Sequence, residues 1–223
     1  DGVLAFWFGP AFFEEPSQLD DFEYVRGRTK KWYRGGPEMD AAAGRFLPLL
    51  RAERAAVEAA PRPLVAQGEL GERAALARVV LFDQVSRNAA RGTAEAFAQD
   101  ALASELAEAL VEGGYAGRCA AAALLALAQA LVHAEVPGDG SRASTAVALL
   151  QAAMPRFPQR TSQLLFQAVL SHEKHLGVLR QFGRYPHRNA ALGRESTPKE
   201  LEWLASPDLP GWARSQTARA PRG

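Results

Sequence analysis

The sequence predicts an all-α protein, and three observations support this. Apolar residues recur with the helical period of about 3.6 in every long segment, no segment alternates with period two, and short Gly- or Pro-containing breaks separate the segments. Successive antiparallel helix hairpins suggest an α-solenoid, although no repeat of about 34 residues carries the usual signature. We expect a single helical domain over residues 1–205 and a Pro/Arg/Gly-rich tail over residues 206–223.

Composition bounds the function classes. The chain has 223 residues and a net charge of +1, which gives no whole-molecule argument for nucleic acid. The single cysteine, Cys119, excludes an intramolecular disulfide and a cysteine-based metal cluster. No apolar stretch reaches the ~18 residues that span a bilayer. We expect a soluble protein of the cytoplasm or of an organelle matrix or stroma, because a chain that starts at Asp1 is compatible with a removed presequence.

The N-terminal third is expected to form a core-facing segment and two helical stretches. Five aromatic residues in the first thirteen positions could form a docking surface, but we favour a terminal segment folded into the core. A helix with an N-cap at Ser17 should run through Trp32 and end near Gly35. A second stretch over residues 38–60 contains Pro48, which predicts a kink or a break. Pro61 and Pro63 should end it.

Residues 69–90 contain a motif in which an apolar helix face runs into a charged one. Leu76, Val79, Asp83 and Arg87 fall at helical spacing, and the acid precedes the arginine by four residues, the better order for an intrahelical pair. A solvated surface pair is one interpretation. We favour a structural or site role, because the residues just before Asp83 are strongly apolar.

Four further helices are expected at residues 93–112, 117–135, 141–153 and 161–182. The second is apolar nearly all round, which is typical of a central buried helix, and His133 and Glu135 stand at its C-terminal end. In the last, His172 lies on an apolar stripe that His175 borders. A histidine on such a stripe is more often a hydrogen-bonded core residue than a ligand.

The segment from Phe182 to Arg194 gathers positive charge between two helices. Gly183 can close the preceding helix, Pro186 favours a loop over residues 185–189, and Thr197 to Glu200 resembles a capping box. The segment has several basic residues and no acid of its own. It should therefore bind an anion or meet buried carboxylates, and we predict that Asp83 and Arg87 lie against residues 185–189, with His133 or Glu135 nearby.

The tail over residues 206–223 has the composition of a disordered segment. Ordering it needs a surface that holds it, and this could be the domain itself or a partner chain.

Several motifs together resemble the bacterial domain-of-unknown-function family numbered 924, over roughly residues 3–204. They are Phe6-Trp7-Phe8-Gly9, Lys31-Trp32-Tyr33, Asp40 with Arg45-Phe46, Asp83-Gln84 with Arg87-Asn88 and Arg91-Gly92, Phe97 with Asp100, His133-Ala134-Glu135, His175, and Phe182 to Arg194. The resemblance implies a tetratricopeptide-like α–α superhelix built from antiparallel helix hairpins. It implies no assigned biochemical function.

Three function classes follow from these observations. We favour a protein-interaction or accessory subunit that binds other protein chains, through the tail among other surfaces. The alternative is an enzyme or a receptor for a small anion, built from one Asp/Arg/His cluster. RNA binding ranks last, because no nucleic-acid module is recognisable. No cofactor is expected, and no close ligand spacing supports a metal. The candidate catalytic residues are Asp83, His133, Glu135, His175 and His187. The candidate anion-binding or structural residues are Arg87, Asn88, Arg91, Arg184, Arg188, Asn189 and Arg194.

Overall fold

The computed structural model describes residues 1–59, 69–135 and 138–216. These residues form helices and no strand, which confirms the all-α prediction. The tetratricopeptide-like superhelix stays a prediction. The expected helix terminators Pro61 and Pro63 lie outside the described residues. The α-helices, in chain order, are α1 (Gly2–Phe8), α2 (Ala11–Glu14), α3 (Phe22–Arg34), α4 (Pro37–Gly44), α5 (Leu47–Ala59), α6 (Glu69–Val79), α7 (Ser86–Ala89), α8 (Asp100–Glu112), α9 (Ala121–His133), α10 (Ser141–Ala153), α11 (Gln159–Phe182), α12 (Pro198–Leu204) and α13 (Gly211–Gln216).

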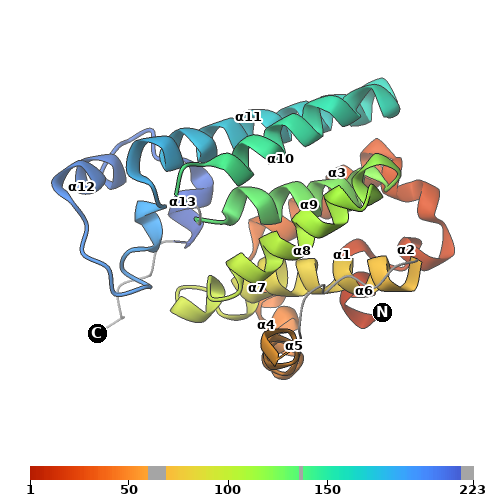
Figure 1. The fold of residues 1–223 in the computed structure, drawn as a ribbon, viewed down its shortest axis with the longest axis horizontal. Helices are drawn as coiled ribbons and strands as arrows, with labels where there is room; N and C mark the ends of the chain where they lie inside the picture. Colours follow the sequence, from red (N-terminus) through yellow and green to blue (C-terminus); the bar gives the residue numbers. More distant parts are fainter. Residues whose placement is uncertain (60–68, 136–137, 217–223) are drawn as a thin grey trace.

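The helices stack in layers around α9 (Figure 1). The long hairpin of α10 and α11 forms the upper layer in this view, and α9 packs against both of its helices and against α8. Every residue of α9 except Gln129 is buried, as its apolar sequence predicts for a central helix. The core therefore runs through α9, and the two polar residues of this helix, Gln129 and His133, meet polar partners.

The N-terminal aromatic residues belong mostly to the core, as expected. Trp7 and Phe8 are buried, and the Trp7 ring stacks on Trp32 of α3 with centroids 4.9 Å apart. Phe13 is the exception, because 40% of it is exposed. Stacked aromatic rings contribute about 1 kcal/mol beyond the area they bury, so this contact fixes α1 against α3.

Several helix boundaries differ from the prediction. The helix expected from Ser17 begins at Phe22, because the Asp21 side chain accepts from the Tyr24 backbone N–H at 2.9 Å and residues Pro16–Asp20 form a 3₁₀ turn. By contrast, the stretch over residues 38–60 breaks between α4 and α5, just before Pro48, which confirms the predicted break. The helix expected from Thr93 begins at Asp100, after a 3₁₀ turn.

The segment between α11 and α12 has the predicted local structure. Gly183 has φ +69° in the left-handed region and closes α11. Tyr185 is extended before Pro186, and Pro186–Arg188 form one 3₁₀ turn, η6. Thr197 and Glu200 form a complete capping box at the start of α12.

Part of the segment expected to be disordered is ordered on the domain. Gly211–Gln216 form α13, which packs against η6, and Ala213 is fully buried. The physical reason is Trp212, whose ring supplies the apolar surface that the rest of the segment lacks. The division into a domain over residues 1–205 and a tail over residues 206–223 stays a prediction, and residues 217–223 lie outside the described part of the chain.

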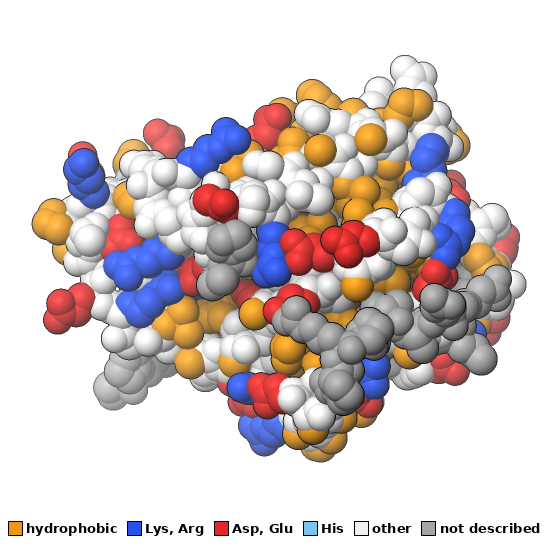
Figure 2. Space-filling model, in the orientation of Figure 1, with side chains coloured by type: hydrophobic (Ala, Val, Ile, Leu, Met, Phe, Trp, Pro, Cys, Tyr) orange, Lys and Arg blue, Asp and Glu red, His pale blue; other side chains and the backbone are white. Residues whose placement is uncertain are grey.

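The face drawn in Figure 2 has mixed charge and several exposed apolar side chains. Figure 2 shows basic and acidic side chains interspersed over one face, with apolar patches over α10 and α11. Phe166 and Leu170 of α11 are 47% and 39% exposed. Among the described helices, none has the length and apolar character needed to cross a lipid bilayer.

Candidate functional site

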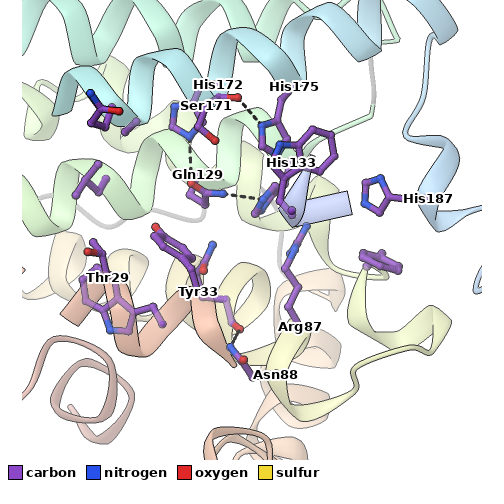
Figure 3. Close-up of a pocket in the computed structure, with 18 of the residues that line it drawn as sticks. Thr29, Tyr33, Arg87, Asn88, Gln129, His133, Ser171, His172, His175 and His187 are labelled. Atoms are coloured by element: carbon purple, nitrogen blue, oxygen red, sulfur yellow. Dashed lines mark hydrogen bonds between the residues drawn. The ribbon is translucent and has the colours of Figure 1, made fainter. Parts of the chain in front are cut away.

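A pocket of about 420 Å³ is enclosed by residues of α3, α9, α11, η6 and α13 and by the segment that follows α6 (Figure 3). Its volume lies in the range of about 300–1,000 Å³ that small-molecule sites occupy. All four histidines of the chain line it, and they are His133, His172, His175 and His187. The helices therefore gather in one place every imidazole that the sequence provides.

A π-helical segment, Val80–Val85, is inserted between α6 and α7, is buried throughout and contributes Gln84 to the pocket lining. A π-turn occurs where side chains satisfy the carbonyls that it releases, and such turns are frequent at functional sites. Here the Ser86 hydroxyl donates to the Phe82 carbonyl at 2.6 Å, and Arg87 Nη1 donates to the Asp83 carbonyl. The segment carries Asp83 and Gln84, so this irregular turn sets where Asp83 points.

Asp83 is the centre of the polar network, and none of it is exposed. Its carboxylate accepts from Arg87 Nη1 at 2.8 Å, from His133 Nδ1 at 2.7 Å and from the side chain of Gln84. A buried carboxylate is tolerated only when donors surround it. Asp83 therefore holds Arg87 and His133 in fixed positions.

A chain of hydrogen bonds leads from Asp83 to the pocket through two imidazoles. Since His133 Nδ1 donates to Asp83, its Nε2 accepts from Gln129 Nε2 at 2.8 Å when the ring is neutral. Gln129 Oε1 then accepts from His172 Nε2 at 3.0 Å. His172 Nδ1 is left as a lone pair, and it is buried without a hydrogen-bond partner among the described residues. The chain therefore fixes the tautomer of His172 and leaves one acceptor unused.

Two arginines from distant parts of the chain share Asp100. Arg87 Nη2 and Arg188 Nη1 donate to Asp100 Oδ2 at 2.8 and 2.9 Å. Both guanidinium groups also lie over the Phe97 ring, 5.7 and 4.8 Å from its centroid. Arg188 Nε is buried without a hydrogen-bond partner within the described chain. The predicted proximity of Arg87 to residues 185–189 is therefore found, but the carboxylate that joins them is Asp100 rather than Asp83.

The C-terminal helix α13 closes another side of the pocket. The Trp212 ring stacks on His175 with centroids 3.8 Å apart and planes at 19°, and it meets the edge of His187 at 5.2 Å. His175 Nδ1 donates to the Ser171 carbonyl at 2.8 Å, which leaves Nε2 as its lone pair. His187 Nδ1 is buried and has no hydrogen-bond partner among the described residues.

The charge that lines the pocket has a single sign. Among the described residues, its charged lining side chains are Arg87, Arg91 and Arg188, and no aspartate or glutamate lines it. The neutralising carboxylates, Asp83, Asp100 and Asp40, contact these arginines but do not line the pocket. A ligand in the pocket would therefore meet guanidinium groups and neutral imidazoles.

Burial shifts the ionisation of the acids and the imidazoles in the same direction, towards their neutral forms. It raises the pKa of Asp83 and Asp100, and the adjacent Arg87 opposes that shift. It lowers the pKa of His172 to about 4 and holds the pKa of the other three histidines well below the ordinary value. At neutral pH all four imidazoles are consequently uncharged, and those of His172, His175 and His187 each keep a nitrogen that can accept a hydrogen bond.

The histidine cluster does not match a metal centre. No group of three or more His, Cys, Asp or Glu side chains in the described chain is arranged to hold a metal ion. The reason lies in the existing bonds, because both nitrogens of His133 and one nitrogen each of His172 and His175 already have partners.

The structure divides the predicted site residues into two groups. Asp83 lies behind the pocket wall, while His133, His175, His187, Arg87, Asn88, Arg91 and Arg188 line the pocket. The others hold the 183–197 segment. Glu135 accepts from Arg194 Nη1 at 2.7 Å and from the Tyr185 backbone N–H at 2.7 Å, and Arg184 Nε donates to Glu200 at 2.7 Å. Arg194 also donates to Asn189 Oδ1 at 3.0 Å, so these residues fix the loop rather than line the pocket.

Sequence reasoning missed four residues of the site: Gln129, His172, Trp212 and Asp100 as the shared counter-charge. His172 was expected to be a core residue, and it is buried as expected, but it also lines the pocket. Gln129 is the one polar residue before the terminal His133 in an otherwise apolar helix, which is a signal that could have identified it. Trp212 was missed because the composition of residues 206–223 predicted disorder for the whole segment.

Comparisons with known proteins agree with the resemblance noted in the sequence. The family described as a bacterial protein of unknown function (DUF924) matches residues 3–208. A solved structure of a protein of unknown function, ATU0120 from Agrobacterium tumefaciens, is 25% identical and superposes with a TM-score of 0.52 over 92% of this chain and 95% of that one. No curated protein matches the chain.

Proposed function

The chain belongs to the bacterial family of unknown function DUF924, and we propose that it binds a small organic anion in the pocket between α3, α9, α11 and α13. His172 then serves as a fixed acceptor that can take a proton from the bound molecule. This is the enzyme or small-anion receptor that the sequence offers as the alternative function, with a role proposed for each residue.

The observation that carries this proposal is the charge of the pocket lining. Three arginines line the pocket: Arg87 from α7, Arg91 from the turn after α7, and Arg188 from η6. No acidic side chain of the described chain lines it. Buried guanidinium groups form the strongest protein hydrogen bonds to carboxylates and similar anions. Arg188 Nε, in particular, is a buried donor without a partner among the described residues.

The acid–base part of the proposal depends on the tautomer of His172. Because its Nε2–H donates to Gln129, the lone pair must be on Nδ1, and that atom is buried without a partner in the described chain. With the pKa of His172 lowered to about 4 by burial, the ring is neutral at pH 7 and accepts from an O–H or N–H of the ligand. Transfer of that proton is favoured when a bound anion stabilises the resulting imidazolium.

The protein-interaction role that the sequence favoured stays a prediction. Its support would be an extended apolar groove, or a tail held by another chain. Residues 211–216 instead pack on the domain itself, with Trp212 in the pocket wall, and this observation favours the small-molecule function.

A binding experiment with a matched pair of variants tests the proposal. Gln167 and Gln163 are both exposed on α11, one turn apart, but Gln167 lines the pocket and Gln163 does not. Titration calorimetry should detect binding of a small carboxylate such as phenylacetate to the wild type. Gln167→Trp should weaken this binding at least about tenfold by filling the pocket, and Gln163→Trp should leave it unchanged. Failure of every carboxylate to bind, or equal effects of the two substitutions, would contradict the proposal.

A further inference from the structure

We infer that the ligand of this pocket is a flat, ring-bearing organic acid with one negative charge, of the aromatic monocarboxylate class. The inference rests on the proposed function and deepens it. Two independent features of the site carry it, namely the aromatic side chains in the wall and the balance of charge around the arginines.

The first feature is the aromatic wall. Tyr33 from α3 and Trp212 from α13 line the pocket from different elements, and both rings keep exposed surface. Phe97 and Trp32 also line it, but both side chains are buried, with only 7% and 3% exposed. Tyr33 and Trp212 are therefore the rings best placed to receive a flat ligand.

Trp212 is held rigidly enough to act as a stacking surface. His175 covers one side of the indole at 3.8 Å, and His175 is itself fixed by its bond to the Ser171 carbonyl. His187 and Tyr185 contact it edge-on at 5.2 and 5.9 Å. A ring that is already immobilised loses little conformational entropy when a ligand stacks on it, which favours a flat ligand over a flexible one.

The second feature limits the ligand to one negative charge. The three lining arginines are matched by three carboxylates, because Asp83 and Asp100 face Arg87 and Arg188, and Asp40 contacts Arg91. The cluster is therefore close to neutral as a whole. Since no net positive charge is left over, hydrogen bonds from the lining arginines are the compensation that the site offers to an anion, and this suits one carboxylate better than a doubly charged group.

The volume of the pocket agrees with a ligand of this size. About 420 Å³ is enough for one substituted ring, and it lies near the lower end of the range for small-molecule sites. Arg188 and His172 both line the pocket, and each has one polar atom without a hydrogen-bond partner in the described chain, the donor Arg188 Nε and the acceptor His172 Nδ1. A carboxylate would complement the first atom, and a hydroxyl or amino group would complement the second.

Four probes that differ in one property each test the inference in the full chain. Phenylacetate is the reference, cyclohexylacetate keeps the charge but is not flat, phenylacetamide removes the charge, and phenylphosphonate adds a second one. We expect phenylacetate to bind most tightly. Cyclohexylacetate should bind roughly three- to tenfold more weakly, and the amide and the phosphonate at least about tenfold more weakly.

A pair of tryptophan substitutions assigns the effect to one residue. Trp212→Leu should reduce the preference for phenylacetate over cyclohexylacetate to about twofold or less. Trp203→Leu, which changes a neighbouring ring that does not line the pocket, should keep the preference. Circular dichroism of both variants checks that the helices are retained.

The outcomes separate this inference from the function on which it rests. Equal binding of phenylacetate and cyclohexylacetate, or tighter binding of the phosphonate, would overturn the aromatic monocarboxylate class while an anion site remained. Binding of no probe at all would overturn both proposals. A preference that Trp203→Leu abolishes as fully as Trp212→Leu would overturn the role of Trp212 in the wall.

Discussion

Replacing Asp83 by alanine should lower the free energy of unfolding far more than any surface substitution does. The carboxylate is fully buried and accepts from Arg87, His133 and Gln84, so its loss leaves Arg87 with Asp100 as its remaining carboxylate and leaves His133 Nδ1 without its acceptor. Removal of one partner from a buried ion pair costs about 3–5 kcal/mol, since the other charge stays behind without compensation. We expect a loss of that size in the free energy of unfolding.

The assay is urea unfolding at neutral pH, with Glu58→Ala as the control. Arg54 and Glu58 form an ion pair with the same i,i+4 spacing and the same nitrogen–oxygen distance of 2.8 Å as Asp83 and Arg87, but their side chains are 41% and 51% exposed. An exposed pair contributes at most about 1 kcal/mol. The two substitutions therefore compare ion pairs of the same spacing and length, although of opposite residue order, in a buried and in an exposed setting.

The thermal melt gives a second reading of the same difference. For a chain of this length each kcal/mol shifts Tm by about 2–4 °C, so Asp83→Ala should melt about 10 °C lower than the wild type and Glu58→Ala within about 3 °C of it. A loss of less than about 1 kcal/mol for Asp83→Ala, with an unchanged m value, would refute the structural pairing. The cluster would then serve the ligand alone, and the same variant should lose anion binding.

Three further outcomes follow from the structure. The pKa of His172 falls from 6.5 to about 4 on folding, so the unfolded chain binds the proton first and the free energy of unfolding falls as pH drops through that window. Between about pH 7 and about pH 4, His172→Gln should lose about 3 kcal/mol less of this free energy than the wild type in urea titrations. Equal losses would refute the pKa shift. Thr197→Ala removes the capping box of α12 and should cost about 1 kcal/mol by the same measurement, whereas Thr197→Ser should cost little. Gly183→Ala places a side chain at φ +69° and should cost about 1 kcal/mol, and a neutral result would show that the α11 terminus relaxes.

Local signals in the sequence determined the class of the fold and many of the helix boundaries. Gly183 as a left-handed helix terminator, the Thr197–Glu200 capping box, the bounds of α10 and the burial of α9 all follow from short stretches of chain. These features depend on residues within one or two helical turns of each other. Their physical cause is therefore present in the sequence itself, whatever the rest of the molecule does.

Only the tertiary structure decided which polar residues meet. Arg188 reaches Asp100 across 88 positions, and His133 reaches Asp83 across 50, with no periodic pattern that marks either pair. The sequence did identify an excess of donors after residue 180 and a buried acid at Asp83, so it predicted a cluster but assigned Asp83 rather than Asp100 as the contact of that segment. The π-turn at Val80–Val85 and the stacking of Trp212 on His175 depend on neighbouring layers of the fold, because each is stable only when distant residues satisfy its backbone or cover its ring.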